Sequence, residues 1–254
     1  MADRFDLRGR TALVTGASSG FGAHFCRVLA DAGAQVIACA RRIERLDELV
    51  RDINERGGDG HAVGMDVTSA DSVARAFEQV DRIGTVDILV NNAGVGDPHR
   101  FVKTTEQDWD HFMETNLKSV WCVSRQCVDR MRAAGNGGSI INIASILGLQ
   151  PGIGLSLYAT SKAGVVQLTR AMALELLSDR IRVNAICPGY FKTEMNDEFF
   201  STPKGQAFIE RTPARRLGKL DELTAPLLLL ASDAGSFING IALPVDGGHL
   251  VHSL

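Results

Sequence analysis

The run Thr11-Ala-Leu-Val-Thr15, continued by Gly16-Ala-Ser-Ser-Gly-Phe-Gly22, decides the fold. The first five residues are apolar or β-branched and predict a buried strand, while Gly20–Ala32 carries apolar residues at helical spacing. Glycines at a strand–turn–helix junction let the backbone turn tightly and approach a phosphate, and the helix N-terminus offers N–H groups and a partial positive charge. The spacing is G-x-x-x-G-x-G rather than G-x-G-x-x-G, so the loop alone is a weak signal. Its place between the first strand and the first helix favours a dinucleotide site.

The rest of the chain repeats the same alternation. Six further apolar runs predict strands: Gln35–Ala40, Ala62–Val67, Ile88–Asn91, Ser139–Ile143, Arg182–Ile186 and Ala242–Val245. Helical patterns lie between them: Ile43–Glu55, Ser69–Asp81, Thr105–Met131, Ala159–Leu177 and roughly Leu220–Ser232. Nearly continuous apolar strands suit a parallel sheet covered on both faces. We therefore expect an α/β fold with a Rossmann-like, doubly wound, seven-stranded parallel sheet and helices on both faces.

Composition agrees with one globular domain. The chain has 254 residues, 45% hydrophobic and 22% charged, and no linker or composition break divides it. We expect a single domain over residues 1–254. The net charge of −3 leaves no basic surplus to neutralise phosphates, which argues against nucleic acid as a partner.

Neither a membrane nor an oxidising compartment is indicated. No stretch approaches the roughly 18 apolar residues of a membrane span, and the first residues lack an apolar signal core. The five cysteines form no C-x-x-C pair and the six histidines show no metal spacing, so we expect buried thiols and no metal site. The expected location is the cytoplasm.

Two further segments fit a nucleotide. Asp66, followed by Val67, lies where the third predicted strand ends, and its carboxylate can accept a hydrogen bond from an adenine amino group. The fourth predicted strand ends in Asn91-Asn92-Ala93-Gly94, whose small residues leave room for a nucleotide between strand ends.

A second constellation indicates acid–base chemistry. Tyr158 and Lys162 are four residues apart, which stacks them on one helix face. An ammonium group nearby favours a phenolate and lowers the pKa of a tyrosine from its usual value of about 10. Ser145 follows the fifth predicted strand and can hydrogen-bond a substrate carbonyl, and Asn116 lies in the preceding helical pattern.

Together these motifs resemble the short-chain dehydrogenase/reductase family over essentially the whole chain, from the glycine loop to Val245-Asp246-Gly247-Gly248. The resemblance implies a catalytic tetrad of Asn116, Ser145, Tyr158 and Lys162. Tyr158 would transfer the proton, Ser145 would position the substrate oxygen, Lys162 would lower the pKa of Tyr158 and bind the nicotinamide ribose, and Asn116 would hold a water. It also implies a homotetramer.

The same resemblance implies a cofactor site that runs along the strand ends. Besides Tyr158 and Lys162, the expected contacts are Gly16, Ser18, Ser19, Gly20, Phe21, Gly22, Arg41, Asp66, Val67, Asn92, Ala93, Gly94, Pro188, Gly189 and Thr193.

The cofactor is expected to be NADP(H) rather than NAD(H). No acidic residue follows the second predicted strand until Glu44, whereas an NAD-selective site usually carries one there. Arg41 is best placed to meet the 2′-phosphate, Ser18 adds a hydroxyl, and Arg42 stacks or faces solvent. The alternative is that both arginines are solvated surface residues.

The predicted activity is NAD(P)(H)-dependent interconversion of a secondary alcohol and a ketone, with a 3-oxoacyl thioester reductase and a broad ketone reductase as candidates. The alternative from another class is a catalytically idle, nucleotide-sensing binding protein on the same fold. We expect a largely apolar pocket, lined by Ile146, Leu147, Leu155, Tyr190, Phe191 and Met195.

One irregular stretch and two prolines need a structural explanation. The irregular stretch Tyr190–Gly218 is either a mobile lid or an ordinary surface helix pair. Pro226 requires that its helix begins near Thr224 or is kinked. Pro244 is tolerable if the last strand lies at the sheet edge.

Overall fold

A parallel sheet forms the centre of the molecule, as expected. The computed structural model describes residues 4–194 and 197–251. Strand β1 (Thr11–Thr15) is buried throughout and pairs in parallel with a strand on either side. The seven strands are ordered β3-β2-β1-β4-β5-β6-β7. The other six are β2 (Gln35–Ala40), β3 (Asp59–Gly64), β4 (Ile88–Asn91), β5 (Gly138–Ile143), β6 (Ile181–Pro188) and β7 (Ala242–Val245).

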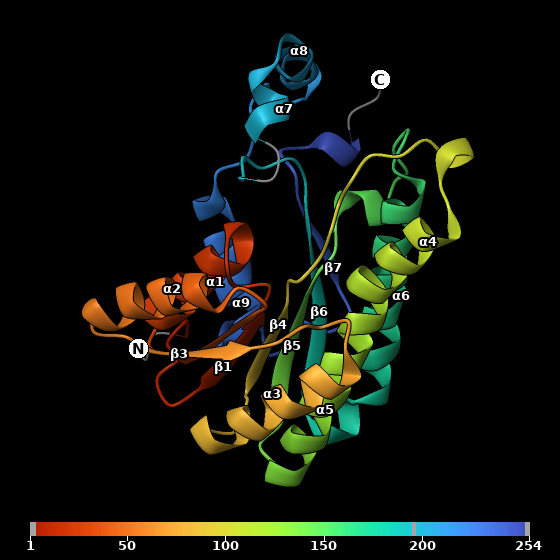
Figure 1. Cartoon of the computed structure of the whole chain (residues 1–254). Coiled ribbons are helices and arrows are strands. Elements are labelled where there is room, and N and C mark those ends of the chain that lie inside the picture. Colours follow the sequence, from red (N-terminus) through yellow and green to blue (C-terminus); the bar gives the residue numbers. More distant parts are fainter. Residues whose placement is uncertain (1–3, 195–196, 252–254) are drawn as a thin grey trace.

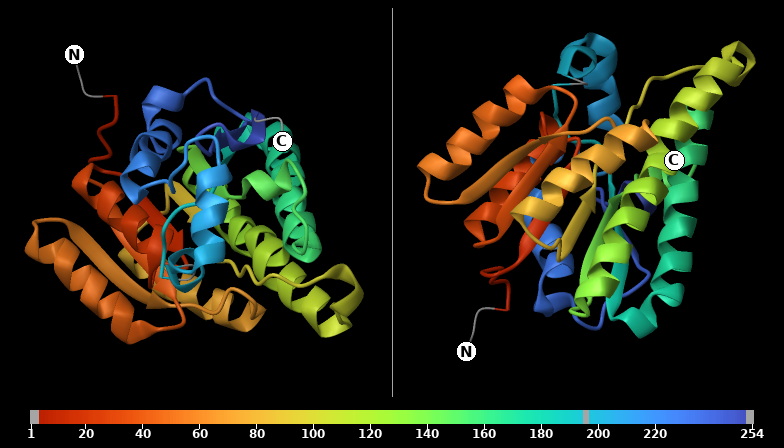
Figure 2. Two further views of the ribbon diagram at one scale, coloured as in Figure 1. Left: turned by 90° about the horizontal axis from the view of Figure 1, so that it is seen from above. Right: turned by 60° about the horizontal axis from the view of Figure 1, so that its bottom comes forward.

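Helices cover both faces of the sheet (Figures 1 and 2). One buried cluster joins the sheet to α1 (Gly20–Asp31), α2 (Ile43–Glu55) and α9 (Thr224–Ala231). A second joins its other face to α3 (Ala70–Ile83), α5 (Ser119–Ala134) and α6 (Ser156–Glu175). The chain reverses its progress through the sheet between β1 and β4, so the carboxyl ends of these strands form the crevice where α/β sheets bind ligands.

Most predicted elements differ from the structure by a few residues at their ends, and two of the differences have a visible local cause. The third strand begins at Asp59 and ends at Gly64, because pairing with β2 starts at the polar pair Gln35 and Asp59. The predicted helix Thr105–Met131 is divided into α4 (Glu106–Met113), a π-helical segment (Glu114–Lys118) and α5. Apolar periodicity alone does not reveal either change.

Both prolines lie where the sequence allows them. A 3₁₀ turn over Leu220–Leu223 precedes α9, which begins at Thr224, so Pro226 lies in the first helical turn and removes no intrahelical hydrogen bond. Pro244 lies in β7 at the sheet edge.

The stretch Tyr190–Gly218 contains two short helices, α7 (Asp197–Ser201) and α8 (Pro203–Arg211). They stand above the carboxyl end of the sheet, as Figure 1 shows. The stretch thus contains a surface helix pair, and the pair lies over the strand ends; Met195 lies outside the described residues.

The cysteines have no disulfide partner, and four of the five are buried. In residues 4–194 and 197–251, no cluster of histidine, cysteine and acidic side chains has a metal-binding arrangement. Within the same ranges, every helix is too short or too polar to cross a membrane.

Candidate active site

The glycine loop packs directly against the end of β4. Gly16 has φ +65°, and a Cβ there would lie 2.8 Å from the Cα of Ala93. A Cβ on Gly22 would lie 2.3 Å from the carbonyl oxygen of Gly16. Thr15 Oγ1 accepts hydrogen bonds from the backbone N–H groups of Asn92 (3.0 Å) and Ala93 (3.1 Å). The predicted loop residues and the end of β4 are thus held tightly together, and Gly94 lies next along the chain, beside Asn116 and Lys162.

The N-terminus of α1 is open to an anion. Its N-cap residue, Ser19, makes no side-chain capping hydrogen bond, and the first turn, which includes Gly20 and Phe21, holds no acidic residue. The first N–H groups of the helix are therefore available to a phosphate. Thr193, from the segment after β6, comes within 3.9 Å of the Cβ position of Gly20. These features fit the pyrophosphate of a dinucleotide.

Arg42, rather than Arg41, contacts the glycine loop. Its Nη2 donates to Ser18 Oγ at 2.8 Å and to Ser19 Oγ at 3.1 Å. Arg42 is exposed, in line with the expectation that it stacks or faces solvent, and it also donates to both serine hydroxyls. Arg41 is exposed and lies near enough to Asp66 to contribute to the lowered pKa of that carboxyl.

Asp66 follows β3 and begins a turn. Hydrogen bonds from the Thr68 hydroxyl (2.7 Å) and backbone N–H (3.0 Å) are the main reason why the pKa of Asp66 lies below its usual value. Its own N–H donates to Ser72 Oγ at 2.9 Å. Asp66 and the neighbouring Val67 are therefore fixed at the edge of the crevice.

Asn116 lies within the π-helical segment and is fully buried. Its Oδ1 accepts from the N–H of Val95 (2.8 Å), and its Nδ2 donates to the carbonyl oxygen of Val95 (3.0 Å) and to Ser161 Oγ (3.1 Å). Single π turns in α-helices are frequent at functional sites. The extra residue in this turn directs Asn116 toward the loop after β4.

Lys162 is buried in α6, and its Nζ donates to the carbonyl oxygen of Ile143 at 2.8 Å. Burial lowers its pKa from 10.5 to about 8. The Nζ also lies 5.8 Å from the centre of the Tyr158 ring and 3.5 Å from the Cβ position of Gly94. The ammonium group thus stands between the tyrosine and the expected cofactor crevice.

Burial raises the pKa of Tyr158 above its usual value, and a hydrogen bond from Ser145 opposes this rise. We expected Lys162 to lower this pKa. In the structure burial dominates, because the ammonium group is directed at Ile143. Ser145 is itself buried at the end of β5, where its Oγ also accepts from the N–H of Leu147 at 3.1 Å. The four expected tetrad residues therefore meet at one place.

Sequence reasoning missed two neighbours of the tetrad. Ser161 is fully buried and links Asn116 to the backbone oxygen of Tyr158, which it reaches at 2.7 Å. The sequence could have indicated Ser161 by its spacing, because a residue three positions after Tyr158 lies on the same inward face of the helix. Cys187, also fully buried, lies beside Ser145 and Lys162, and burial raises its pKa to about 11.

The segment after β6 completes the crevice. Pro188 ends β6, and a Cβ on Gly189 would lie 2.8 Å from the Cα of Asp246, so only glycine fits against the turn after β7. Phe191 does not line a substrate pocket: it is 3% exposed and packs edge-on against Phe21, with the ring centroids 5.5 Å apart.

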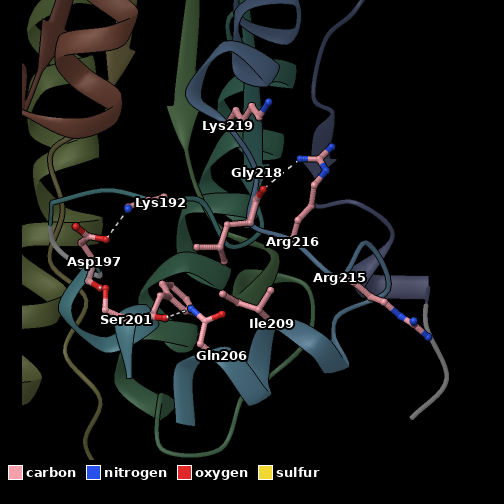
Figure 3. A pocket seen from close by; sticks show the side chains of 11 residues that line it. Lys192, Asp197, Ser201, Gln206, Ile209, Arg215, Arg216, Gly218 and Lys219 are labelled. Carbon is pink, nitrogen blue, oxygen red and sulfur yellow. Dashed lines mark hydrogen bonds and ion pairs between the residues drawn. The ribbon is translucent and has the colours of Figure 1, made fainter. Parts of the chain in front are cut away.

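A pocket of about 440 Å³ lies between α7–α8 and the segment that follows them, and Figure 3 shows the side chains that line it. Lys192 pairs with Asp197 across it at 2.9 Å, and Arg216 on its wall pairs with Glu222 at 2.6 Å. No tetrad residue lines it. A smaller depression adjoins Tyr158 and is lined by Asp97, His99, Phe112, Gly154, Leu155, Ser156 and Leu157.

Comparison with known proteins gives one consistent result. A sequence model described as short chain dehydrogenase matches residues 10–204. The 3-oxoacyl-[acyl-carrier-protein] reductase of Thermotoga maritima is 37% identical over 246 residues, which cover 96% of this chain and 99% of the relative. The 5-keto-D-gluconate 5-reductase of Escherichia coli is 38% identical over 256 residues, 99% of either chain. A gluconate 5-dehydrogenase from Burkholderia cenocepacia, solved with NADP and tartrate, is 36% identical with a TM-score of 0.94, over 99% of both chains.

Proposed function

The chain belongs to the short-chain dehydrogenase family, and from that premise we propose that it interconverts a secondary alcohol and a ketone by hydride transfer with NADP(H), as a single NAD(P)-binding domain over residues 1–254. Members of this family are oxidoreductases, and relatives are named as dehydrogenases and reductases. The observation that carries the proposal is the convergence of Tyr158, Ser145 and Lys162 beside the dinucleotide crevice.

Each residue has a role that suits its surroundings. NADPH, when bound, supplies the hydride. Tyr158 gives a proton to the carbonyl oxygen during reduction and takes it back during oxidation. Ser145 holds the same oxygen, and its hydrogen bond to Tyr158 supports that placement.

Lys162 contacts the cofactor, and Lys162 and Asn116 together relay protons between Tyr158 and solvent. Lys162, with a pKa of about 8, exchanges protons readily near neutral pH and lies close to the crevice at Gly94. Asn116 fixes the Val95 backbone and Ser161. Its proposed role is to hold the water that connects Lys162 to solvent.

The preference for NADP(H) over NAD(H) rests on charge. The crevice offers Arg42, Ser18 and Ser19 where the 2′-phosphate would lie, and no acidic side chain is among the hydrogen-bond partners of these hydroxyls. Solved relatives with NADP bound agree with this choice. The other residues that the sequence analysis names as cofactor contacts are proposed as such because they lie along the carboxyl ends of the strands.

The substrate is a small molecule. A 3-oxoacyl thioester and a broad range of ketones remain the two candidates from the sequence, and the relatives add sugar-acid ketones such as 5-keto-D-gluconate. We place the enzyme in the cytoplasm because its free thiols suit a reducing compartment.

We also propose a homotetramer. Large apolar side chains are exposed on the outer face of α4, α5 and α6: Trp109 is 48%, Trp121 53% and Leu174 74% exposed. Burial of this face against another copy removes it from water. Light scattering at micromolar concentration tests the assembly, and a mass of 27 kDa would contradict it.

Replacement of Tyr158 by Phe tests the reaction itself. Because the ring is kept and the hydroxyl is lost, turnover falls about 10²–10⁴-fold, the contribution of a positioned acid or base. NADPH binding, followed by fluorescence titration, stays close to that of the parent. Near-normal turnover of the variant with a ketone panel would refute the assignment.

A further inference from the structure

Two buried polar atoms lack a hydrogen-bond partner within residues 4–194 and 197–251: Ser156 Oγ and His249 Nδ1. A buried polar atom without a partner destabilises a protein by about 1–3 kcal/mol, so most such atoms have a partner. Each exception therefore requires a physical explanation, of which a functional role is one. Ser156 lies two residues before Tyr158, and His249 packs against Tyr190, which lies near Tyr158.

Ser156 is the first residue of α6 and precedes Tyr158 by two positions. With Tyr158 it lines a shallow depression that also contains Asp97 and His99. His99 forms an isolated parallel bridge with Leu155, which holds the loop after β4 against the start of α6. This side of the tyrosine is therefore more polar than the apolar pocket expected from the sequence.

His249 reaches the same edge of the sheet from β7. The register pairs Pro188 at the end of β6 with Val245 at the end of β7, so both strands leave the sheet side by side. The Asp246 carboxylate accepts the N–H groups of Gly248 (2.9 Å) and Leu250 (2.8 Å) and so fixes the turn that carries His249.

Tyr190 connects His249 to the reacting tyrosine. The rings of Tyr190 and His249 are 5.3 Å apart and meet edge to face, and Phe208 of α8 packs on both of them. On its other side Tyr190 is near enough to Tyr158 for its hydroxyl to add to the raised pKa there. His249 thus offers a nitrogen within an otherwise aromatic wall.

We propose that Ser156 and His249 determine substrate specificity, each by hydrogen-bonding an oxygen substituent of the substrate on a different side of the reacting carbon. The substrate is then a small ketone with hydroxyl or carboxylate groups on both sides of the carbonyl, or the corresponding alcohol, rather than an acyl chain. This inference rests on the proposed function.

The chemistry of the two groups supports this class. A serine hydroxyl both donates and accepts, and an imidazole presents a donor and an acceptor nitrogen. A hydroxylated substrate satisfies both buried atoms, whereas an alkyl chain leaves them unpaired. The aromatic rings around His249 can pack against the carbon chain of the substrate, while its Nδ1 atom bonds one of the substrate's hydroxyl or carboxylate oxygens.

A matched substrate series tests the preference. Acetone, hydroxyacetone and 1,3-dihydroxyacetone share one carbon skeleton and differ only in hydroxyl groups. The expected kcat/KM for reduction with NADPH rises by roughly tenfold with each hydroxyl. A second pair of substrates compares a sugar-acid ketone, 5-keto-D-gluconate, with a 3-oxoacyl thioester, the acetoacetyl thioester of N-acetylcysteamine. The keto acid is expected to be reduced faster.

Variants then locate the contacts. Ser156→Ala and His249→Phe are each expected to lower kcat/KM for 1,3-dihydroxyacetone by roughly tenfold, mainly through KM, and to leave acetone nearly unchanged. His249→Asn, which restores a polar atom near the Nδ1 position, is expected to recover much of the loss. Phe199→Leu alters the same aromatic cluster at an exposed position and is the packing control.

Three outcomes would overturn the inference: preference for acetone or the thioester, an equal loss on all ketones in both variants, or no recovery with His249→Asn. The proposed function survives each of them, because ketones are still reduced. If the parent reduces no ketone with either cofactor, the proposed function fails as well.

Discussion

Lys162 Nζ and the carbonyl oxygen of Ile143 are hydrogen-bonded at 2.8 Å, so a helix ammonium group is anchored to the end of a central strand. The lysine is buried, and its pKa of about 8 lies below the 10.5 of the free side chain. The folded state therefore holds this proton less tightly than the unfolded state does. The site gains a group that exchanges protons near neutral pH, and the fold loses stability in return.

Lys162→Met is expected to stabilise the cofactor-free protein at pH 7 while abolishing activity. Below pH 8 the lysine is charged in both states and its burial is fully unfavourable; between pH 8 and 10.5 this penalty disappears as the folded state releases the proton. A difference of about 2 kcal/mol is expected at pH 7, after allowing for the lost hydrogen bond to Ile143. Thermal melting from pH 7 to 10 measures it. A less stable variant at pH 7, or a difference that grows with pH, contradicts the prediction.

Ser145→Ala is expected to move the pH profile as well as to slow the reaction. Burial raises the pKa of Tyr158 and the Ser145 hydrogen bond opposes the rise, so its removal raises that pKa further. Alcohol oxidation needs the deprotonated tyrosine, and its rate should therefore rise at more alkaline pH than in the parent. Ser145→Thr keeps the hydroxyl and should retain the parent profile. An unchanged midpoint in Ser145→Ala would separate Ser145 from the ionisation of Tyr158.

Much of the fold follows from the sequence because β1 and the turn after it are specified locally. Buried parallel strands read as short apolar runs, and glycines mark the junction with α1. The spacing of Tyr158 and Lys162 likewise fixes a shared helix face. The sequence does not predict the start of β3, because the strand begins at Asp59, a polar residue paired with Gln35, and the prediction used apolar runs.

The rest of the site depends on tertiary contacts. An α-helical and a π-helical turn accept the same apolar residues, so the turn that directs Asn116 toward Val95 has no sequence signature. Arg41 and Arg42 are adjacent in sequence, and the N-cap position of Arg42 decides which of them faces Ser18. The pKa of Tyr158 depends on burial, which spacing does not report.

Arg42→Ala is expected to reduce the preference for NADP(H) more than Arg41→Ala does. A hydrogen bond to a charged group contributes about 1.5–3 kcal/mol, which corresponds to a 10- to 150-fold fall in the ratio of kcat/KM for the two cofactors. Arg51→Ala removes an exposed charge from the same helix and serves as the control. A larger effect in Arg41→Ala would return the phosphate contact to that residue, and a parent that prefers NAD(H) would refute the preference itself.

Arg45 and Glu194 form an ion pair of 3.0 Å that joins α2 to the segment after β6. Glu194 follows Thr193, which lies beside Gly20, and Arg45 lies one turn beyond Arg42, so the pair connects the two segments that flank the glycine loop. A bound dinucleotide would lie beneath this connection, and its release should require the pair to separate.

Glu194→Gln is therefore expected to speed NADPH release, measured by stopped-flow fluorescence. An exposed ion pair contributes at most about 1 kcal/mol, so the rate should rise by no more than about fivefold, and the difference should shrink at high salt. Arg45→Gln should have the same effect, and the double variant should add nothing, because either change breaks the same pair. Asp52→Asn breaks the Arg27–Asp52 ion pair, which joins α1 to α2 at the surface, and should leave release unchanged. Additive effects of the two substitutions, or equal acceleration in Asp52→Asn, would show that general loosening of the surface, and not this pair, controls release.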